Sequence, residues 1–522
     1  MNPSATKTHK KHKNGFESER PTAGFFVFLV PLYICFVLSG ATGLIYEILW
    51  ARMLGLVFGA TTLAVSTVLA AFMGGLALGS ALAGRLAPRI RKPVSAYGWM
   101  EIAIAIYALL VPLLFRAVDD LYAYIWQQLH PGFFTFTLLR FALSSLLLLV
   151  PTTLMGATLP VLSAALLRVA GHDSNAVTRL YACNLAGAIF GTLAAGFVLL
   201  PSFGVRTTII IAAAINIFVG VIAFGIQRKA FQDVPREVET DLPDRAEMTV
   251  VDSPRFWLFA AFASGFVTIS TQVSWTRILT MIIGSSTYAF SIVVALFLIG
   301  LAGGAWIVGR KDRTAKLRTT IMIVEVITAV SLVFSLFVLN RIPALLIKLG
   351  LGFQVSSWGG LLVLQIVSAT LLIFVPALLM GMVMPLVLVW ASNQVRAVSR
   401  VGRSYAVNTI GAIAGAFATG FVLIPGTSTR FTLVLAAFIC LVVAILAYRP
   451  RGDGLAPVAR RSIAIGLTPV LLIVLFIVAP RMNLADLSIG AYDTLVRELA
   501  QTREIQTDTA PANGPNIHQL LM

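Results

Sequence analysis

Residues 181–201 read YACNLAGAIFGTLAAGFVLLP, and residues 405–425 read YAVNTIGAIAGAFATGFVLIP. Both stretches begin with tyrosine, end with proline and carry the same asparagine and glycines at the same places between them. Neither contains a charged residue, and each is long enough to cross the roughly 30 Å hydrocarbon core of a membrane as a helix. The chain therefore contains two related membrane segments, 224 positions apart.

The repeat extends along most of the chain. Residues 39–54, SGATGLIYEILWARML, match residues 264–279, SGFVTISTQVSWTRIL, and residues 150–160, VPTTLMGATLP, match residues 375–385, VPALLMGMVMP. The agreement covers six apolar segments on each side. Two halves in the same orientation predict a parallel repeat about an axis along the membrane normal, the plan of the major facilitator superfamily, whose substrate site lies between the halves.

The composition is that of a membrane protein. Of the 522 residues, 58% are hydrophobic and only 12% are charged. Barrel strands would alternate apolar and polar residues, which these segments do not, so we expect an all-α polytopic membrane protein. The repeat gives an N-terminal half, 23–227, and a C-terminal half, 256–448, followed by one additional C-terminal helix. The thirteen expected spans are 23–46, 60–84, 96–116, 136–167, 180–201, 207–227, 256–282, 287–309, 319–340, 360–393, 404–425, 430–448 and 462–480.

The placement of positive charge predicts the topology. The net charge is +17, and basic residues gather in the tail 1–22, the linker 228–255 and the loop 449–461. By the positive-inside rule these segments are cytoplasmic, and thirteen spans then put the tail 481–522 on the extracytoplasmic side. The charge thus indicates contact with the lipid bilayer and argues against nucleic-acid binding. The first apolar run follows a long polar tail without a small-residue cleavage site, so we interpret it as an uncleaved span.

Small residues recur every four positions in matching helices, which lets helix backbones approach closely in lipid. Asparagine sits inside two of these helices, at Asn184 and Asn408, each three residues after a tyrosine, Tyr181 or Tyr405. A buried amide needs partners, so we expect each asparagine to tie its helix to a neighbour or to contact a substrate. The small residues concerned are Gly75, Gly79 and Ala83, then Gly187, Gly191 and Ala195, with Gly300, Gly304, Gly411 and Gly415 repeating the glycines.

An acidic residue, Glu47, lies in the first span. Gly40, Gly43 and Glu47 fall at helical positions i, i+3 and i+7, so the carboxylate is expected to share a close-packed face and to point at protein rather than lipid. Gln272 is the matching residue of the second half. The carboxylate is either a site for a cation or proton, or part of a structural clamp between helices.

Three more ionisable residues are expected within spans. Glu101 and Glu325 match each other in the repeat, and Arg140 is the only arginine deep in an expected span. Charged groups at such depth are costly, so by default they are candidates for a substrate or ion site. The alternative is again a buried clamp that locks the bundle. The three cysteines, Cys35, Cys183 and Cys440, provide neither a disulfide framework nor a metal cluster.

With these motifs the chain resembles the membrane portion of bacterial proteins in which a major-facilitator bundle is fused to a spermidine-synthase-like domain. The resemblance runs over roughly residues 23–500 and rests on SGATGLIYEILWARMLGLVFG, FMGGLALGSALAGR and YACNLAGAIFGTLAAGFVLLP. It implies a location in the bacterial inner membrane. The family motif falls on Gly40, Gly43, Tyr46, Glu47, Trp50 and Arg52, with Trp275 and Arg277 repeating two of them, and on Tyr181, Asn184 and Gly187.

The sequence departs from the fused pattern near its end. Residues 484–499, LADLSIGAYDTLVREL, resemble the junction to the synthase domain, but only a short polar segment follows. An aminopropyltransferase needs a Gly-rich turn for the nucleoside and acidic residues for the amines, and neither is present. We therefore expect no catalytic site, metal site or cofactor in this chain.

Three functions remain open. The first is a transport or substrate-handling module, with polyamine-like cations favoured because the intramembrane charges are mostly acidic. The second is a truncated or split aminopropyltransferase-type protein that works with a soluble synthase-like partner domain. The third is a membrane scaffold.

Overall fold

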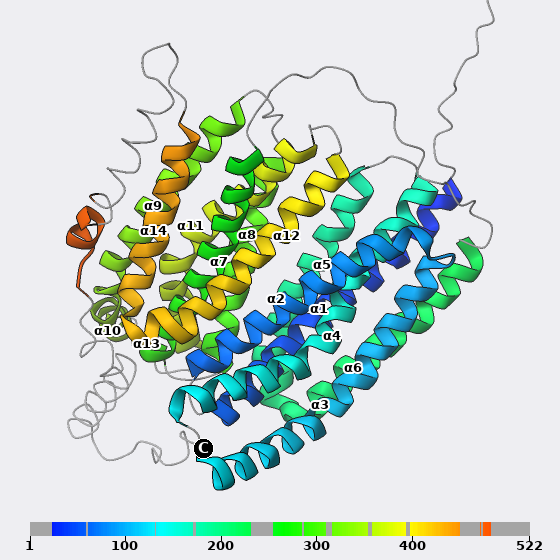
Figure 1. Cartoon of the computed structure of the whole chain (residues 1–522), viewed down its shortest axis with the longest axis horizontal. Coiled ribbons are helices and arrows are strands. Elements are labelled where there is room, and N and C mark those ends of the chain that lie inside the picture. The colour runs from blue at the N-terminus through cyan, green and yellow to red at the C-terminus, as the bar shows by residue number, and fades with distance from the viewer. Residues whose placement is uncertain are drawn as a thin grey trace, which may run out of the picture.

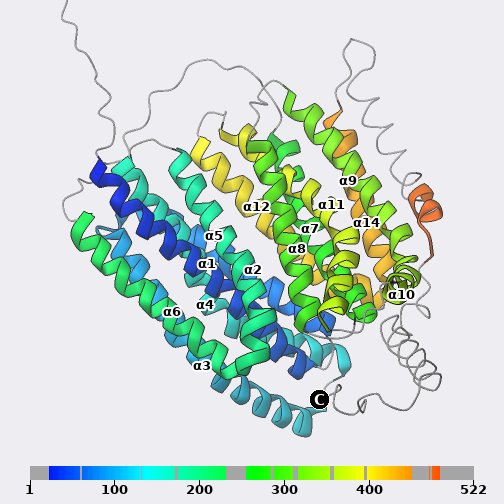
Figure 2. The same ribbon diagram turned by 180° about the vertical axis from the view of Figure 1, so that it is seen from behind.

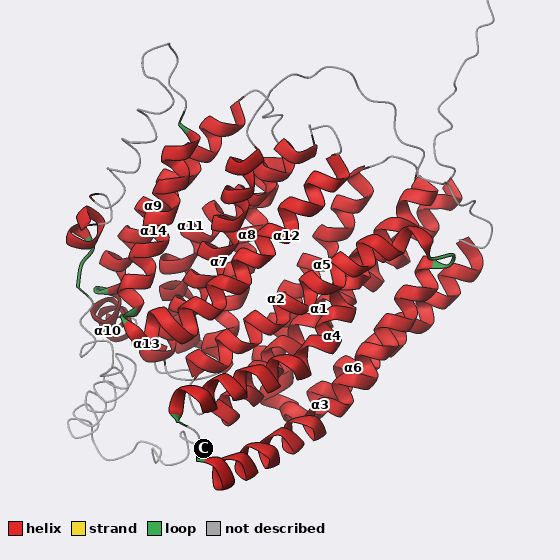
Figure 3. Ribbon diagram, in the orientation of Figure 1, coloured by secondary structure: helices red, strands yellow, loops and turns green. Residues whose placement is uncertain are grey.

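The computed structural model describes residues 23–58, 61–130, 132–170, 174–230, 254–283, 287–309, 316–352, 358–392, 397–448, 470 and 473–481. Within these ranges all regular secondary structure is helical (Figure 3). The expected all-α class is therefore confirmed. The basic tail, most of the interdomain linker, the loop 449–461 and nearly all of the tail 481–522 lie outside the described residues.

In the described part of the chain, each half contributes six long helices, which lie side by side in Figure 1. The N-terminal half has α1 (Ala23–Phe58), α2 (Thr61–Leu86), the short η1 (Ala87–Arg89), α3 (Pro93–Leu129), α4 (Phe133–Ala170), α5 (Ser174–Ala194), the π-helical η2 (Ala195–Leu199) and α6 (Leu200–Ala230). The C-terminal half has α7 (Pro254–Ile283), α8 (Thr287–Gly309), α9 (Leu317–Leu339), α10 (Ile342–Gly352), α11 (Trp358–Ser392), α12 (Ala397–Phe417), the π-helical η4 (Ala418–Leu423), α13 (Ile424–Gly426) and α14 (Thr429–Ala447).

Eleven described helical segments are long and apolar enough to cross a membrane. One of them, Arg179–Lys229, joins two helices across a kink at Gly204, where φ is 70° and ψ is 179°. Because this left-handed conformation favours glycine, the kink separates two of the expected spans. The helix α10 was not expected, and its 11 residues are too few to span a bilayer. The expected thirteenth span, 462–480, lies mostly outside the described residues.

The helices pair in the same way in both halves. In the N-terminal half α1 packs on α5, α2 on α4 and α3 on α6, and in the C-terminal half α7 packs on α12, α8 on α11 and α9 on α14. The pairs α3–α6 and α9–α14 form opposite edges of the molecule (Figures 1 and 2). Large apolar side chains such as Trp99 and Leu113 on α3, and Val330 and Phe334 on α9, are exposed there, as expected for surfaces that face lipid.

Glycine sets the distance between the paired helices. A Cβ atom on Gly187 or Gly191 of α5 would collide with the backbone carbonyl of Val37 or Ala41 on α1. Gly411 and Gly415 of α12 lie in the same way against the backbone of Phe262 and Phe266 on α7. The two halves therefore make equivalent glycine contacts. The small-residue pattern in the sequence therefore marks these helix contacts correctly.

A short described segment, residues 473–481, packs against the C-terminal half. The Arg430 guanidinium donates to the carbonyl oxygens of Phe476 and Ala479 at 2.6 and 2.7 Å. The Asn340 amide donates to the carbonyl of Arg481 at 3.0 Å. Since Asn340 follows α9 and Arg430 lies in the first turn of α14, this segment lies at the end of the bundle where α9 ends.

Candidate functional site

The interface between the two halves is the first candidate site. It is formed mainly by α2 against α12 and by α5 against α8, two contacts that are equivalent under the repeat. At one end of this interface the Ser291 hydroxyl of α8 lies directly against Gly196 of η2. The equivalent Ser66 of α2 lies directly against Gly420 of η4. Two matching serine–glycine contacts therefore close this end.

These two serines have no hydrogen-bond partner among the residues that the structure describes. Ser66 and Ser291 are fully buried, and within the described chain their hydroxyl oxygens are unpaired. A buried hydroxyl without a partner is unfavourable. Both serines contact π-helical turns, which are rare and occur frequently at functional sites. The combination makes these two contacts candidates for a functional closure between the halves.

Further along the same interface, Tyr181 of α5 and Tyr405 of α12 form a side-chain hydrogen bond across the two halves. Both residues were expected as site candidates, and the structure brings them together. Their side chains are otherwise 43% and 41% exposed. The two halves thus meet through the phenol hydroxyls of Tyr181 and Tyr405, and through serine side chains that lie against glycine backbone at the two serine–glycine contacts.

The two intramembrane asparagines mark where the first helix of each half crosses its partner. A Cβ atom on Gly40 would meet the backbone oxygen of Asn184, and one on Gly265 would meet that of Asn408. Both amides are half-buried, and no hydrogen bond to another described residue joins either side chain. The expected amide tie between helices is therefore absent from the described residues, and the close approach is made by the backbone.

Glu47 is buried, as expected, with 4% of its surface exposed, and the equivalent Gln272 is 7% exposed. Among the described residues no hydrogen bond or ion pair reaches either side chain. The expected stripe is only partly close-packed, because Gly40 abuts α5 whereas nothing lies within 4 Å of a Cβ placed on Gly43. Glu47 is thus a carboxylic group inside the bundle that no described residue pairs with.

The aromatic residues of the motif are core residues. Tyr46 and Trp50 stack with ring centroids 5.5 Å apart, and Trp50 contacts Phe72 at 6.3 Å. The repeat reproduces the second contact as Trp275 against Phe297 at 5.8 Å. These rings join the first and second helices of each half, so their role is packing. The motif arginines, Arg52 and Arg277, are exposed and partly exposed, respectively.

Glu101 belongs to a clamp between α3 and α1. The Ser39 hydroxyl donates to its Oε1 atom at 2.6 Å, and the Tyr97 hydroxyl, which donates to the Cys35 carbonyl at 3.3 Å, lies beside the same carboxylate. The other oxygen, Oε2, is buried without a partner in the described part of the chain. Ser39, Tyr97 and Glu101 thus fix two helices of one half, which supports the structural interpretation for this acid.

Removing this clamp should lower stability. We expect Glu101→Ala to destabilise the folded chain by about 1–2 kcal/mol, the upper range for hydrogen bonds between membrane helices. Ser39→Ala should cost less, because the Tyr97 contact remains. Thermal unfolding in detergent measures the stability of both variants. A Glu101→Ala protein with the unfolding temperature of the parent would contradict the clamp between α1 and α3.

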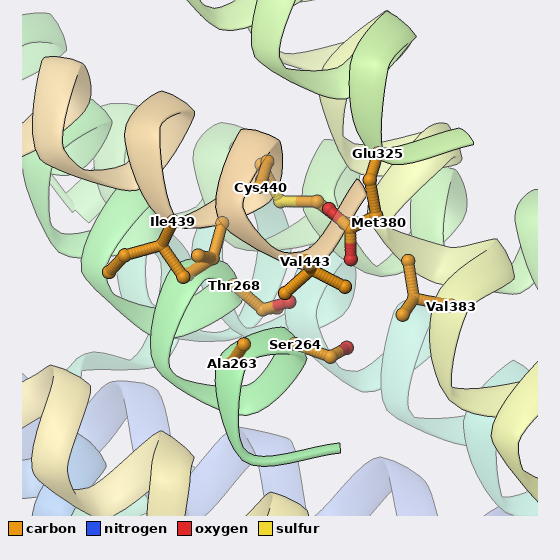
Figure 4. Close-up of a pocket in the computed structure, with 10 residues that line it drawn as sticks. Ala263, Ser264, Thr268, Glu325, Met380, Val383, Ile439, Cys440 and Val443 are labelled. Carbon is orange, nitrogen blue, oxygen red and sulfur yellow. The ribbon is translucent and has the colours of Figure 1, made fainter. Parts of the chain in front are cut away.

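Glu325, the repeat counterpart of Glu101, has different surroundings. The Cys440 thiol of α14 hydrogen-bonds its carboxylate, and both line a small cavity within the C-terminal half (Figure 4). The cavity has a volume of about 10 Å³, roughly that needed for one water molecule. It is far too small for an organic substrate.

Arg140 lies near Asp119, an acid close to the end of α3, rather than beside Glu47, Glu101 or Glu325. It is the eighth residue of α4, and its guanidinium sits over the rings of Phe136 at 4.3 Å and Tyr122 at 5.6 Å. The Tyr122 hydroxyl donates to the Arg140 carbonyl at 3.0 Å. This cation–π cluster anchors α4 to the last turns of α3 and does not line the interface between the halves.

The sequence interpretation missed the serine–glycine contacts. Ser66 matches Ser291, and Gly196 matches Gly420, at the repeat shift, so identical residues did mark them. The sequence pattern did not single out these serines and glycines, because small residues also occur at ordinary contacts between helices. In the described ranges no cluster of three or more His, Cys, Asp or Glu residues suits a metal ion.

Comparison with known proteins supports the fold and gives a partial sequence relationship. No family model matches the chain. It is 30% identical over 204 residues to polyamine aminopropyltransferase 2 of Streptomyces coelicolor, covering 38% of this chain and 34% of that protein. It is 28% identical over 199 residues to polyamine aminopropyltransferase 1 of the same organism, covering 38% and 33%. The chain thus spans about a third of the length of these curated relatives.

Solved transporters share the architecture. The nucleoside transporter NupG aligns with a TM-score of 0.53 at 14% identity, over 80% of this chain and 98% of that structure. A bacterial homologue of the iron transporter ferroportin, in an inward-facing state, aligns with a TM-score of 0.52 at 12% identity, over 81% and 97%. The chain is a multi-pass membrane protein with the fold of major facilitator transporters.

Proposed function

We propose that the chain is a transport module that moves a small cationic, polyamine-like molecule by alternating access between its two halves. The observation that carries the proposal is the interface between the halves, which has matched contacts at two levels. Ser66–Gly420 and Ser291–Gly196 close one end, and the Tyr181–Tyr405 hydrogen bond joins the halves nearer the other end. Small contacts of this kind can separate without unfolding either half, as rocking of one half against the other requires.

The preference for a cation rests on charge. Glu47 is a buried acid on the first helix of the bundle, and no described basic side chain pairs with it. An unpaired carboxylate at this depth favours a positively charged ligand or a proton. The partial likeness to polyamine aminopropyltransferases points to the same class of ligand.

That likeness also favours a second candidate, a membrane part of an aminopropyltransferase-type protein of the fused major-facilitator and synthase family. In that case a soluble synthase-like partner supplies the chemistry, and this chain delivers or removes the amine. We place the protein in the bacterial inner membrane, with its N-terminus in the cytoplasm and its C-terminus outside. Binding of an amine by the purified chain fits both candidates, whereas aminopropyl transfer by the chain alone would overturn the assignment as a non-catalytic module.

Glu47→Gln tests the cationic site. The change keeps size and hydrogen bonding but removes the charge, so we expect spermidine to bind the variant at least about tenfold more weakly, which is about 1.4 kcal/mol. Isothermal titration of the purified full chain measures this, with nucleosides and amino acids as neutral or zwitterionic comparisons. Gln272→Glu is the converse variant and should bind the amine more tightly. If Glu47→Gln folds and binds every ligand of the parent equally, the proposed role of this carboxylate is wrong.

A further inference from the structure

Three phenylalanine rings meet across the interface between the halves. Phe141 lies on α4 of the N-terminal half, whereas Phe417 and Phe421 lie on α12 and η4 of the C-terminal half. The centroid of the Phe141 ring is 5.3 Å from that of Phe417 and 5.0 Å from that of Phe421, at interplanar angles of 66° and 75°. Edge-to-face geometry of this kind is favourable for aromatic pairs. Phe141 therefore joins the two halves by two ring contacts.

These rings belong to the same closure as one of the serine–glycine contacts. Phe421 directly follows Gly420 in the π-helical turn η4, and Gly420 lies against Ser66 of α2. Phe417 is the last residue of α12, and its ring stacks on that of Phe421 with centroids 5.0 Å apart. A movement that separates Gly420 from Ser66 therefore also draws both rings away from Phe141.

Contacts within the N-terminal half hold Phe141 in place. The Tyr122 hydroxyl of α3 donates to the carbonyl of Arg140, the residue before Phe141, at 3.0 Å. The Tyr107 hydroxyl of α3 donates to the carbonyl of Leu147, further along α4, at 2.9 Å. These two hydrogen bonds tie α4 to α3 on either side of Phe141, so its ring is presented to the other half from a fixed position.

The repeat shows that the fold does not require a ring at this place. Phe141 corresponds to Ile366 of α11, and Phe417 corresponds to Leu193 of α5. Ile366 and Leu193 are 36% and 39% exposed. The same architecture thus accepts aliphatic residues at the equivalent positions, and the contact of Phe141 with Phe417 is not a general packing feature of the two halves.

We propose that Phe141 is the closing residue of this interface: its ring, seated against Phe417 and Phe421, stabilises the arrangement in which this end is closed. The inference rests on the proposed alternating access between the halves. The two ring contacts exist only while the halves are together, so their interaction free energy favours the closed state over the open one. Removing the ring therefore shifts the population towards open molecules and leaves Glu47 in place.

The test measures opening in the purified full chain in detergent, with Cys183→Ala and Ser66→Cys. The introduced thiol is buried in the closed arrangement, so its rate of alkylation by a polar maleimide reports the open fraction. Phe141→Leu removes the ring and should raise this rate by about tenfold, which is about 1.4 kcal/mol. Phe141→Tyr keeps the ring and should keep the parent rate. Ile366→Ala, at the equivalent position of the other half, is the matched control and should leave the rate unchanged.

A double-mutant cycle identifies the contact responsible. Phe421→Leu should raise the alkylation rate to a similar extent, because it removes the partner ring. Adding Phe421→Leu to Phe141→Leu should raise the rate little further, since both changes break the same contact. Fully additive effects would show that the two residues act independently and would overturn the proposal.

Two further results would overturn it. One is an unchanged rate with Phe141→Leu. The other is an equal rise with Phe141→Leu and Phe141→Tyr, which would indicate a general loosening of the structure rather than loss of the ring contact. Because thiol reactivity does not involve amine binding, an absence of spermidine binding would overturn the proposed ligand and leave the role of Phe141 standing.

Discussion

Gly196→Val is expected to hold one end of the interface between the halves open and to reduce transport by at least about tenfold. The Ser291 hydroxyl already touches the Gly196 backbone, so a valine side chain has no space in the closed arrangement. Overpacking of this kind costs about 1–3 kcal/mol, and about 1.4 kcal/mol changes a conformational ratio tenfold. Gly420→Val should act in the same way through Ser66.

The opening can be measured without knowing the substrate. In a chain carrying Cys183→Ala and Ser66→Cys, the introduced thiol is buried at the Gly420 contact and should react slowly with a polar maleimide. Adding Gly196→Val at the other, equivalent contact should speed alkylation of the introduced thiol by at least about tenfold. The reason is that each half moves as a rigid body, so a valine side chain that separates one serine–glycine contact also separates the other.

Gly426→Val is the matched control for this experiment. Gly426 lies three residues beyond η4, and nothing stands within 4 Å of a Cβ atom placed there. The control should leave the alkylation rate of Ser66→Cys at its original value. An unchanged rate with Gly196→Val would mean that the two serine–glycine contacts are not coupled and that this end is not a moving closure.

The repeat explains why so much of the fold could be predicted from the sequence. Identical glycines at matching places, such as Gly187 and Gly411, are required wherever two helix backbones touch, and the structure shows those contacts in both halves. Apolar run length located the spans because a helix in lipid must satisfy its backbone internally. The kink at Gly204 falls between the expected spans 180–201 and 207–227, whereas the short helix α10 was not expected, because its 11 residues are too few to count as a span.

The candidate site was harder to predict, because side chains that lie far apart in sequence decide its chemistry. Glu101 and Glu325 match in the repeat, yet Ser39, 62 residues away, fixes the first, whereas Cys440 contacts the second. Tyr181 and Tyr405 were candidates because they occupy matching positions in the repeat. The hydrogen bond between them depends on how the two halves pack against each other, which the repeat does not specify. Arg140 was expected deep in a span, but it lies near the start of α4, over the rings of Phe136 on α4 and Tyr122 on α3.

Gly79→Val should prevent the N-terminal half from packing. A Cβ atom on Gly79 of α2 would collide with the backbone oxygen of Thr153 on α4, and on the facing helix one on Gly156 would collide with the backbone of Leu76. A carbonyl inside a helix cannot move aside alone, so the whole of α2 must shift and lose its contacts with α4. Among them is the hydrogen bond from the Ser80 hydroxyl to the Gly156 carbonyl, 2.9 Å long.

The expected loss from Gly79→Val is about 3 kcal/mol or more, at the upper end of overpacking costs, and size-exclusion profiles and thermal unfolding in detergent measure it. Gly84→Val on the same helix is the matched control, because nothing lies within 4 Å of its Cβ position. Gly304→Val in α8 should destabilise the C-terminal half similarly, since its Cβ would meet the Leu378 carbonyl of α11. Equal unfolding temperatures for Gly79→Val and Gly84→Val would show that the α2–α4 contact is looser than its glycines indicate.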